Sequence, residues 1–166
     1  MRRRRPNQKS MDYKTMTLDE IRGLKIRQWA DDEDCLIFMW TIQKYLYESK
    51  EILEGWGFNY LVTGVWEKTY GRSAGMPLYV FLWNAEFYLV GYTGRPPLFP
   101  KRKLIPLAFS APNVRHSEKP NIFYDRLLML DGPRIDIFAR KERAGWDVWG
   151  DEVECLPSQG VLRFHV

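Results

Sequence analysis

RIDIFARKERAGWDVWGDEV, residues 134–153, sets the architecture expected for this chain, because a short apolar segment there runs straight into a polar loop. Pro133 stops a helix from entering the segment, and no 3.6-residue apolar repeat continues after it. Ile135, Ile137 and Phe138 can therefore be buried only as strand residues. We predict a strand that ends at Phe138, and the ends of strands in α/β sheets are where ligands bind.

The loop after this strand gathers groups that suit a ligand with an adenosine part. Arg140 lies just past the strand's end, and Asp151 and Glu152 bring carboxylates that can bind hydroxyl groups. Two glycines allow close backbone approach, and two tryptophans offer stacking surfaces. These residues are Gly145, Trp146, Trp149 and Gly150. Loops of this composition also occur as ordered surface, so a ligand site and a structural loop both remain open.

The composition indicates a single folded domain with an anionic partner. The 166 residues are 45% hydrophobic and 15% aromatic, which excludes a disordered chain and suffices for one core. The net charge is +4, and the basic residues gather in two runs, Arg2–Arg5 with Lys9 and Lys101–Lys103. Such runs favour nucleic acid as a partner, although a basic terminus can also be a solvated tail.

Cysteine and histidine are too few and too scattered to predict a metal centre. The chain has two of each, Cys35 and Cys155 with His116 and His165, without close spacing. We therefore expect no metal site and no disulfide scaffold, and a reduced, cytoplasmic setting. No apolar run approaches the roughly 20 residues of a membrane span, and no signal-peptide core follows the first arginines.

Apolar periodicity predicts strands that alternate with helices. Thr17 and Glu20 have the spacing of a capping box, so a helix begins after Thr17. CLIFMW, residues 35–40, is a continuous apolar run, typical of a strand buried on both faces in the middle of a parallel sheet. In order, we expect a helix at 17–24, a strand at 35–40, a helix at 42–54 that Gly55 stops, a strand at 60–66, a polar loop at 68–75, strands at 87–92 and, at a sheet edge, 104–109, a polar loop at 110–120, a helix at 121–130 and a strand at 134–138. This alternation predicts a doubly wound α/β sheet.

Four blocks of the chain, taken in order, carry a family resemblance. They are Tyr13-Lys14-Thr15-Met16-Thr17 leading to Asp19-Glu20, LIFMW at 36–40, the segment from Trp56-Gly57-Phe58 to Val65-Trp66-Glu67-Lys68-Thr69, and HSEKPNIFYDRL at 116–127 before IDIFARKERAGWDVWGDEV. Together they resemble the MT-A family of adenine-N6 methyltransferases. That family contains the catalytic subunit of the messenger-RNA N6-methyladenosine writer and many bacterial, archaeal and phage DNA adenine methylases. The resemblance runs from about Tyr13 to Val153.

The resemblance implies a fold, a cofactor and a reaction. The fold would be α/β, a Rossmann-like class I methyltransferase sheet with helices on both faces that lacks its first strand, the one that bears the catalytic motif. The cofactor would be S-adenosylmethionine, whose methyl group passes to the exocyclic amine of adenine. The partner would be nucleic acid, DNA more than RNA, because a compact single domain resembles the prokaryotic and phage members. The target base must leave its stack in either case.

The family's motifs imply roles for nine residues of this chain. Lys119 matches a lysine near the cofactor carboxylate and the acceptor base, and Arg140 matches an arginine that contacts the cofactor ribose. Asp151 and Glu152 fall where the family has Asn followed by Glu or Gln as ribose ligands. Five residues would line or flank the target-base pocket: Tyr13, Trp40, Trp66, Lys68 and Glu86. Structural roles stay open as well, since the two tryptophans suit a core, Glu86 a turn cap and Lys119 a solvated loop.

The family's Asp-Pro-Pro-Trp motif does not occur in these 166 residues. In the family, the motif holds the attacking amine through a carboxylate and a backbone carbonyl. An adenine amine is barely nucleophilic, so catalysis relies on orienting its lone pair. The one Pro-Pro pair, Pro96-Pro97, lies elsewhere in the order of blocks. We therefore assign no catalytic residue and expect a truncated or split product, a start placed too late, or an inactive relative.

Two functions follow from the resemblance and from the missing motif. The first is a methyltransferase, or an amino-terminally truncated form of one, that modifies adenine in nucleic acid. The second is a noncatalytic methyltransferase-like subunit that binds nucleic acid or a partner. In either case a homodimer or heterodimer could supply the catalytic motif. The domains expected are a basic segment at 1–12, a methyltransferase-like domain at 13–155 and an extension at 156–166.

Overall fold

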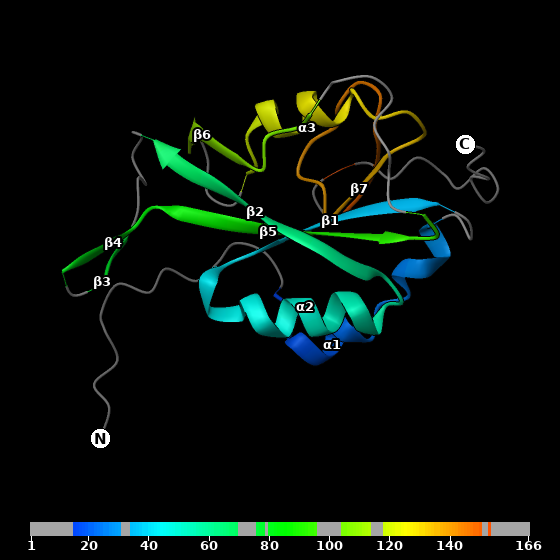
Figure 1. The fold of residues 1–166 in the computed structure, drawn as a ribbon, viewed down its shortest axis with the longest axis horizontal. Helices are drawn as coiled ribbons and strands as arrows, with labels where there is room; N and C mark the ends of the chain where they lie inside the picture. The colour runs from blue at the N-terminus through cyan, green and yellow to red at the C-terminus, as the bar shows by residue number, and fades with distance from the viewer. Residues whose placement is uncertain are drawn as a thin grey trace.

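A four-stranded sheet with helices on both faces forms the centre of the computed structural model, which describes residues 15–30, 34–69, 76–78, 80–95, 104–113, 118–150 and 153 (Figure 1). The sheet consists of β1 (Cys35–Thr41), β5 (Ala85–Thr93), β2 (Asn59–Thr69) and β6 (Ala108–Pro112), in that spatial order. Helices α1 (Leu18–Arg22) and α2 (Leu46–Gly55) lie on one face and α3 (Asn121–Leu127) on the other. Two short pairs complete the described fold, β3 (Met76–Leu78) with β4 (Phe81–Trp83) and β7 (Ile135–Ile137) with β8 (Asp147–Trp149). The α/β class with helices on both faces is thereby confirmed.

The sheet is mixed, which differs from the parallel sheet that the sequence predicts. β5 runs antiparallel to both β1 and β2, and β2 runs parallel to β6. β1 and β2 are therefore parallel to each other, as a βα unit requires, but β5 lies between them. β1 pairs with β5 alone among the described strands, and all of its residues are half-buried. The prediction that β1 lies in the middle of a parallel sheet is wrong, because an apolar run reports burial and not the direction of the neighbouring strand.

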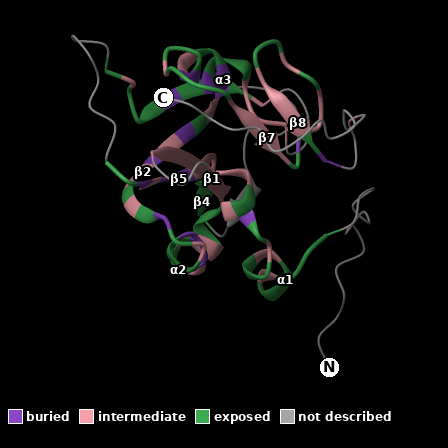
Figure 2. Cartoon of the chain, turned by 90° about the vertical axis from the view of Figure 1, so that its right-hand side faces the viewer, coloured by how far each residue is buried: buried purple, intermediate pink, exposed green. Residues whose placement is uncertain are grey.

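Each face of the sheet carries its own apolar cluster. Both α2 and α3, which cover the two faces, contain buried residues (Figure 2). On one face Leu53 of α2 is fully buried against Leu89 and Phe58. On the other face Phe123 of α3 packs on the ring of Tyr88, with centroids 5.1 Å apart. The Tyr88 ring fits because it lies across Gly64, where any side chain would collide with it.

The capping box at the start of α1 is confirmed, and several other boundaries differ from prediction. Thr17 Oγ1 accepts from the Glu20 amide at 3.2 Å, and the Glu20 carboxylate accepts from the Thr17 amide at 2.6 Å. The second helix begins as a 3₁₀ turn (Gln43–Tyr45) and continues through Gly55, and the positive φ of 87° falls at Gly57 instead. α3 ends at Leu127 rather than at 130.

The strand boundaries show where tertiary contacts override local pattern. β2 extends to Thr69, so the start of the expected polar loop is strand. β6 begins only at Ala108, after Pro106, which cannot donate to a ladder. The loop expected after Phe138 contains β8, which pairs in parallel with β7. The β3–β4 pair was not predicted either.

Several sequence features lie outside the described residues. These are Arg2–Arg5, Tyr13, Lys101–Lys103, Asp151, Glu152 and Cys155. Among the residues that are described, no helix combines the length and apolar character needed to cross a membrane.

Candidate functional site

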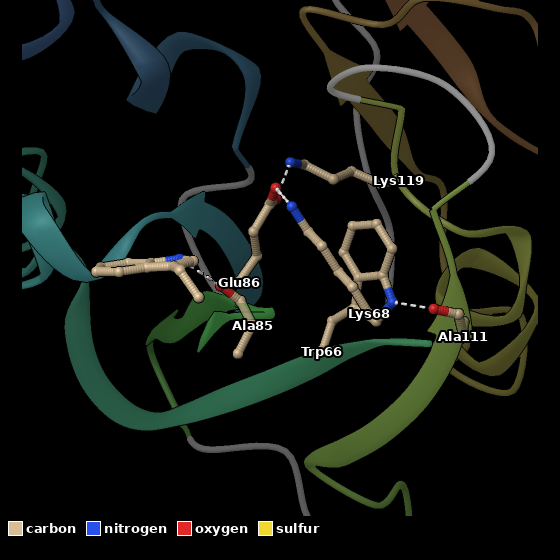
Figure 3. Close-up of polar contacts among 7 residues, drawn as sticks. Trp66, Lys68, Ala85, Glu86, Ala111 and Lys119 are labelled. Atoms are coloured by element: carbon tan, nitrogen blue, oxygen red, sulfur yellow. Dashed lines mark hydrogen bonds and ion pairs between the residues drawn. The ribbon is translucent and has the colours of Figure 1, made fainter. Parts of the chain in front are cut away.

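One carboxylate, that of Glu86, holds two lysine ammonium groups (Figure 3). Lys68 Nζ lies 2.5 Å from Glu86 Oε1, and Lys119 Nζ lies 2.5 Å from Glu86 Oε2. The three side chains are only 12 to 20% exposed, so water screens their charges weakly. Two positive charges against one negative charge leave the group with a net charge of +1, which suits an anionic or electron-rich ligand.

Two tryptophans lie beneath the lysines. Lys119 Nζ is 5.0 Å from the centroid of Trp40, and Lys68 Nζ is 5.3 Å from the centroid of Trp66. The two indoles meet edge to face, with centroids 6.0 Å apart at 83°. Trp66 Nε1 donates to the Ala111 carbonyl at 2.9 Å, which ties the indole to β6 (Figure 3). We call Trp40, Trp66, Lys68, Glu86 and Lys119 the Glu86 cluster.

Strand register explains why four members of the Glu86 cluster meet. Glu86 of β5 lies opposite Trp66 of β2, and Lys68 is two residues further along β2. Trp40 of β1 lies opposite Tyr88 of β5, two residues from Glu86. Alternate residues of a strand share a face, so all four point to the α3 side of the sheet. Lys119 reaches them from the segment that leads into α3.

The ion pairs keep Glu86 charged. Burial disfavours a carboxylate and alone would raise the pKa of Glu86, but the ammonium groups of Lys119 and Lys68 outweigh it, so the pKa lies below its ordinary value. Such a carboxylate is a poor proton acceptor at neutral pH. It is suited to accept hydrogen bonds and to orient the two lysines.

A cavity of about 280 Å³ opens beside the cluster at the end of β1. Trp40, Glu86 and Lys119 form its polar and aromatic side. The remaining lining is mainly apolar: Leu18, Ile21, Met39, Thr41, Ile42, Tyr45, Ser49 and Ile52. The lining thus combines an apolar surface with one charged and aromatic edge.

A second cavity, of about 380 Å³, lies on the other side of Lys119. It runs between β6 and the start of α3 and includes Glu118 and Lys141. These two side chains form an ion pair that joins the segment before α3 to the loop after β7. Lys119 and Arg140 are the sequence neighbours of this pair, so their segments are held side by side. Pattern reasoning did not find Glu118 or Lys141, although both fall within the blocks that carry the family resemblance.

A sharp turn and a close backbone approach shape the β7–β8 loop. Phe138 has a φ of 64° at the end of β7, an uncommon conformation that turns the chain sharply. Gly150 is buried against Ala139, and a Cβ there would lie 2.6 Å from the Ala139 carbonyl oxygen. Gly150 is therefore required by the packing of the chain on itself. By their chemistry alone, the Arg140 guanidinium can donate to ribose hydroxyls and the Lys119 ammonium can donate to a carboxylate.

Six of the nine predicted site residues fall within the described part of the chain. Five of them form the Glu86 cluster, and Trp66, at 1% exposure, is a core residue as well as a member. Arg140 follows β7 and is not among the residues whose contacts define the cluster, and Tyr13, Asp151 and Glu152 are not described.

Comparison with known proteins gives the family. The model of the MT-A70 family matches residues 1–152. The chain belongs to the MT-A70 family. The resemblance stated from the four blocks is thereby confirmed, and an MT-A70 domain is consistent with the Rossmann-like sheet described above.

Relatives of this MT-A70 chain include one bacterial and two plant proteins. The chain is 32% identical over 160 residues to the type II methyltransferase M.MunI of a Mycoplasma species, an alignment that covers 92% of this chain and 66% of that protein. It is 28% identical over 151 residues to an N(6)-adenosine-methyltransferase MT-A70-like protein of Arabidopsis thaliana, covering 86% of this chain and 22% of the relative. A similar rice protein, named as a probable enzyme of this kind, is 29% identical. The chain thus spans about two thirds of the first relative and about a fifth of the plant proteins.

Proposed function

We propose that this chain is part or all of an S-adenosylmethionine-dependent adenine-N6 methyltransferase that acts on nucleic acid. The observation that carries the proposal is the Glu86 cluster at the edge of the 280 Å³ cavity, in a chain of the MT-A70 family. Residues 13–155 would form the methyltransferase domain, between a basic segment at 1–12 and an extension at 156–166. A cytoplasmic location stays a prediction.

Lys119, Arg140, Asp151 and Glu152 would hold the cofactor. Lys119 offers an ammonium group for its carboxylate, while Arg140 and the two acidic residues offer partners for its ribose hydroxyls. When bound, S-adenosylmethionine supplies a methyl group on a sulfonium, which is transferred to the N6 amine of adenine. Lys141 and Glu118, by their ion pair, keep the Arg140 and Lys119 segments together.

The acceptor adenine would occupy the 280 Å³ cavity, whose lining includes Trp40 and Glu86. Trp66 and Lys68 would act from behind, through their contacts with Trp40 and Glu86. Tyr13 is assigned to the base by the family resemblance alone. Trp40 offers an aromatic face, and the apolar lining excludes water from the base. Glu86 accepts hydrogen bonds and orients Lys119, but with its low pKa it is a weak base. Glu86 is therefore not assigned as the acceptor of the amine proton. Asp-Pro-Pro-Trp would reach the site from sequence outside these 166 residues or from a dimer partner.

DNA is the proposed substrate in preference to RNA. The relative named as a type II methyltransferase is the more similar one and aligns over more of its length than the Arabidopsis N(6)-adenosine-methyltransferase-like protein. Methyl transfer from labelled S-adenosylmethionine to adenine-containing DNA and RNA, read as N6-methyladenine after nuclease digestion, tests this preference. The assay is run with and without a supplied Asp-Pro-Pro-Trp segment. Absence of methylation in both arms, with cofactor and nucleic acid still bound, would favour the noncatalytic subunit instead.

Cofactor binding is the first prediction. Calorimetric titration of the purified chain with S-adenosylmethionine should show binding, and Lys119→Ala or Arg140→Ala should weaken it at least tenfold, about the 1.4 kcal/mol of one charged hydrogen bond. Lys50→Ala is the matched control, because Lys50 is 45% exposed on α2, where its ammonium pairs with Glu54 and lies 5.3 Å from the centroid of the Tyr60 ring, on the face of the sheet opposite α3. A folded chain that does not bind the cofactor, or unchanged affinity in both site variants, contradicts the assignment.

A further inference from the structure

A buried group of three side chains fastens α3 to the β7–β8 loop. Arg143 Nη1 from the loop lies 2.9 Å from Asp136 Oδ2 on β7. The Arg143 guanidinium carbon lies 3.6 Å from the ring centroid of Tyr124 on α3, and the Tyr124 hydroxyl hydrogen-bonds to Asp136. The charged side chains are 11% and 17% exposed. We call Tyr124, Asp136 and Arg143 the Arg143 clamp.

The Arg143 clamp is better suited to fixing a geometry than to adding stability. Burial raises the pKa of Tyr124, and the neighbouring Asp136 charge adds to the effect, so the phenol stays neutral and donates to the carboxylate. Arg143 Nε and the nearby Trp146 Nε1 are buried without a hydrogen-bond partner in the described part of the chain. Buried ion pairs with incomplete hydrogen bonding contribute little net stability compared with apolar packing. Their hydrogen bonds still fix the orientation of the side chains relative to one another.

The Arg143 clamp joins two segments of the chain, and each segment contains one of the proposed cofactor residues. Tyr124 follows Lys119 by five positions, with only Pro120 and the first turn of α3 between them. Asp136 and Arg143 flank Arg140, four residues before it and three after it. The Glu118–Lys141 ion pair joins the same two segments a second time.

We propose that Arg143 is a positioning residue that, through Asp136 and Tyr124, sets the spacing between Lys119 and Arg140. This inference rests on the proposed function. A ligand that contacts both residues needs them at one fixed separation, and pre-organisation of that separation lowers the cost of binding. A ligand that contacts Arg140 alone gains nothing from it. The clamp thus favours a ligand long enough to contact both Lys119 and Arg140.

Two ligands of different length test the proposal. S-adenosylhomocysteine carries both the adenosine part and the amino-acid carboxylate, whereas 5′-methylthioadenosine lacks the carboxylate. Arg143→Lys keeps the positive charge but loses the planar guanidinium that stacks on Tyr124 and donates to Asp136. Calorimetry should show roughly tenfold weaker binding of S-adenosylhomocysteine to this variant. Loss of a residue that only orients a ligand-binding residue has an effect of about this size at metal sites. The affinity for 5′-methylthioadenosine should not change. Tyr124→Phe, which removes one hydroxyl and keeps the ring, should shift the two ligands in the same unequal way.

Leu53→Val is the control for general destabilisation, because Leu53 is fully buried in α2 on the opposite face of the sheet and lines neither cavity. It should lower the melting temperature and leave both affinities unchanged. Equal weakening of both ligands in Arg143→Lys, or no weakening of either, would overturn the proposal and leave the clamp a purely structural feature. If the unaltered chain binds neither ligand, the cofactor assignment itself fails and the inference falls with it.

Amide hydrogen exchange provides a ligand-free measurement. Loss of the clamp should speed exchange at residues 118–122 and 138–143 and leave β1 and β5 unchanged. Unchanged exchange at both of the first two segments would show that the clamp does not hold them together.

Discussion

The Glu86 carboxylate is a single negative charge between two ammonium groups, 2.5 Å from each. Its pKa is lowered because the attraction of Lys119 and Lys68 exceeds the cost of burial. A group whose pKa is lower in the folded state stabilises that state above its unfolded pKa, and this contribution disappears as the pH falls through the folded pKa. Acid should therefore weaken the Glu86 cluster from below about pH 4.3, the ordinary value for glutamate.

Glu86→Gln makes this consequence measurable. The variant leaves Lys68 and Lys119 without a counter-charge, so at pH 7 it should lower the free energy of unfolding by about 1–3 kcal/mol. The difference from the unaltered chain should shrink as the pH is lowered below about 4.3, because the glutamate becomes neutral first in the unfolded chain and then, at its lower pKa, in the folded chain. Urea unfolding at a series of pH values checks the prediction. Glu54→Gln, in the exposed pair with Lys50, should change stability by less than about 1 kcal/mol. A Glu86→Gln difference that does not vary with pH would argue against the lowered pKa.

At the scale of elements, the β7–β8 pair depends on a close backbone approach. The Ala139 amide donates to the Trp149 carbonyl at 3.0 Å, and Gly150 then passes over the Ala139 backbone. This approach fixes the course of the chain on both sides of Ala139, just before Arg140. The glycine is thus required by sterics and not by φ, since its φ is not positive.

Gly150→Ala should strain this pair. Its Cβ would lie 2.6 Å and 2.9 Å from Ala139 backbone atoms, which cannot move aside as a flexible side chain would, so we expect a loss of about 1–3 kcal/mol in thermal unfolding. Gly55→Ala is the matched control. Nothing lies within 4 Å of its Cβ position at the end of α2, and the substitution should be neutral or stabilise by up to about 1 kcal/mol. Equal effects of the two substitutions would contradict the close approach.

For the whole molecule, the distribution of charge bears on the proposed partner. The net charge is +4, and Arg2–Arg5 form the longest basic run in the sequence. Lysines and arginines that contact phosphates release counterions, so the affinity for nucleic acid falls as salt rises. A basic run of this kind would add affinity for any sequence, while recognition of adenine would belong to the cavity beside Glu86.

Replacement of Arg2–Arg5 by serine should reduce the salt dependence of DNA binding. The slope of log affinity against log salt should fall by about 0.9 for each arginine that contacts a phosphate. Fluorescence anisotropy with a labelled duplex at several salt concentrations measures it. Replacement of Lys44, just before α2, together with Lys50, on α2, serves as a control for the loss of positive charge at another surface. If the slope is unchanged in the arginine variant, the basic run is a solvated tail.

Local features of the fold were predictable from the sequence because neighbouring residues decide them. The capping box of Thr17 and Glu20 involves residues three apart, and the apolar runs of β1, β2 and β5 reflect burial that does not depend on which strand lies alongside. Four members of the Glu86 cluster lie in the blocks that resemble the MT-A family, and Glu86, outside those blocks, was assigned from the same resemblance. Periodicity alone would not have singled them out, since Trp66 is also an ordinary core residue.

By itself, the sequence determined the α/β class, the family and the residues from which the candidate site is built. Only the tertiary structure decided that β5 lies between β1 and β2, that Glu86 contacts lysines 18 and 33 residues away, and that Arg143 stacks on Tyr124. The reason is that a one-dimensional pattern records how often a residue is buried. Strand direction, register and the pairing of distant charges depend on how loops close, and a local pattern carries no information about that.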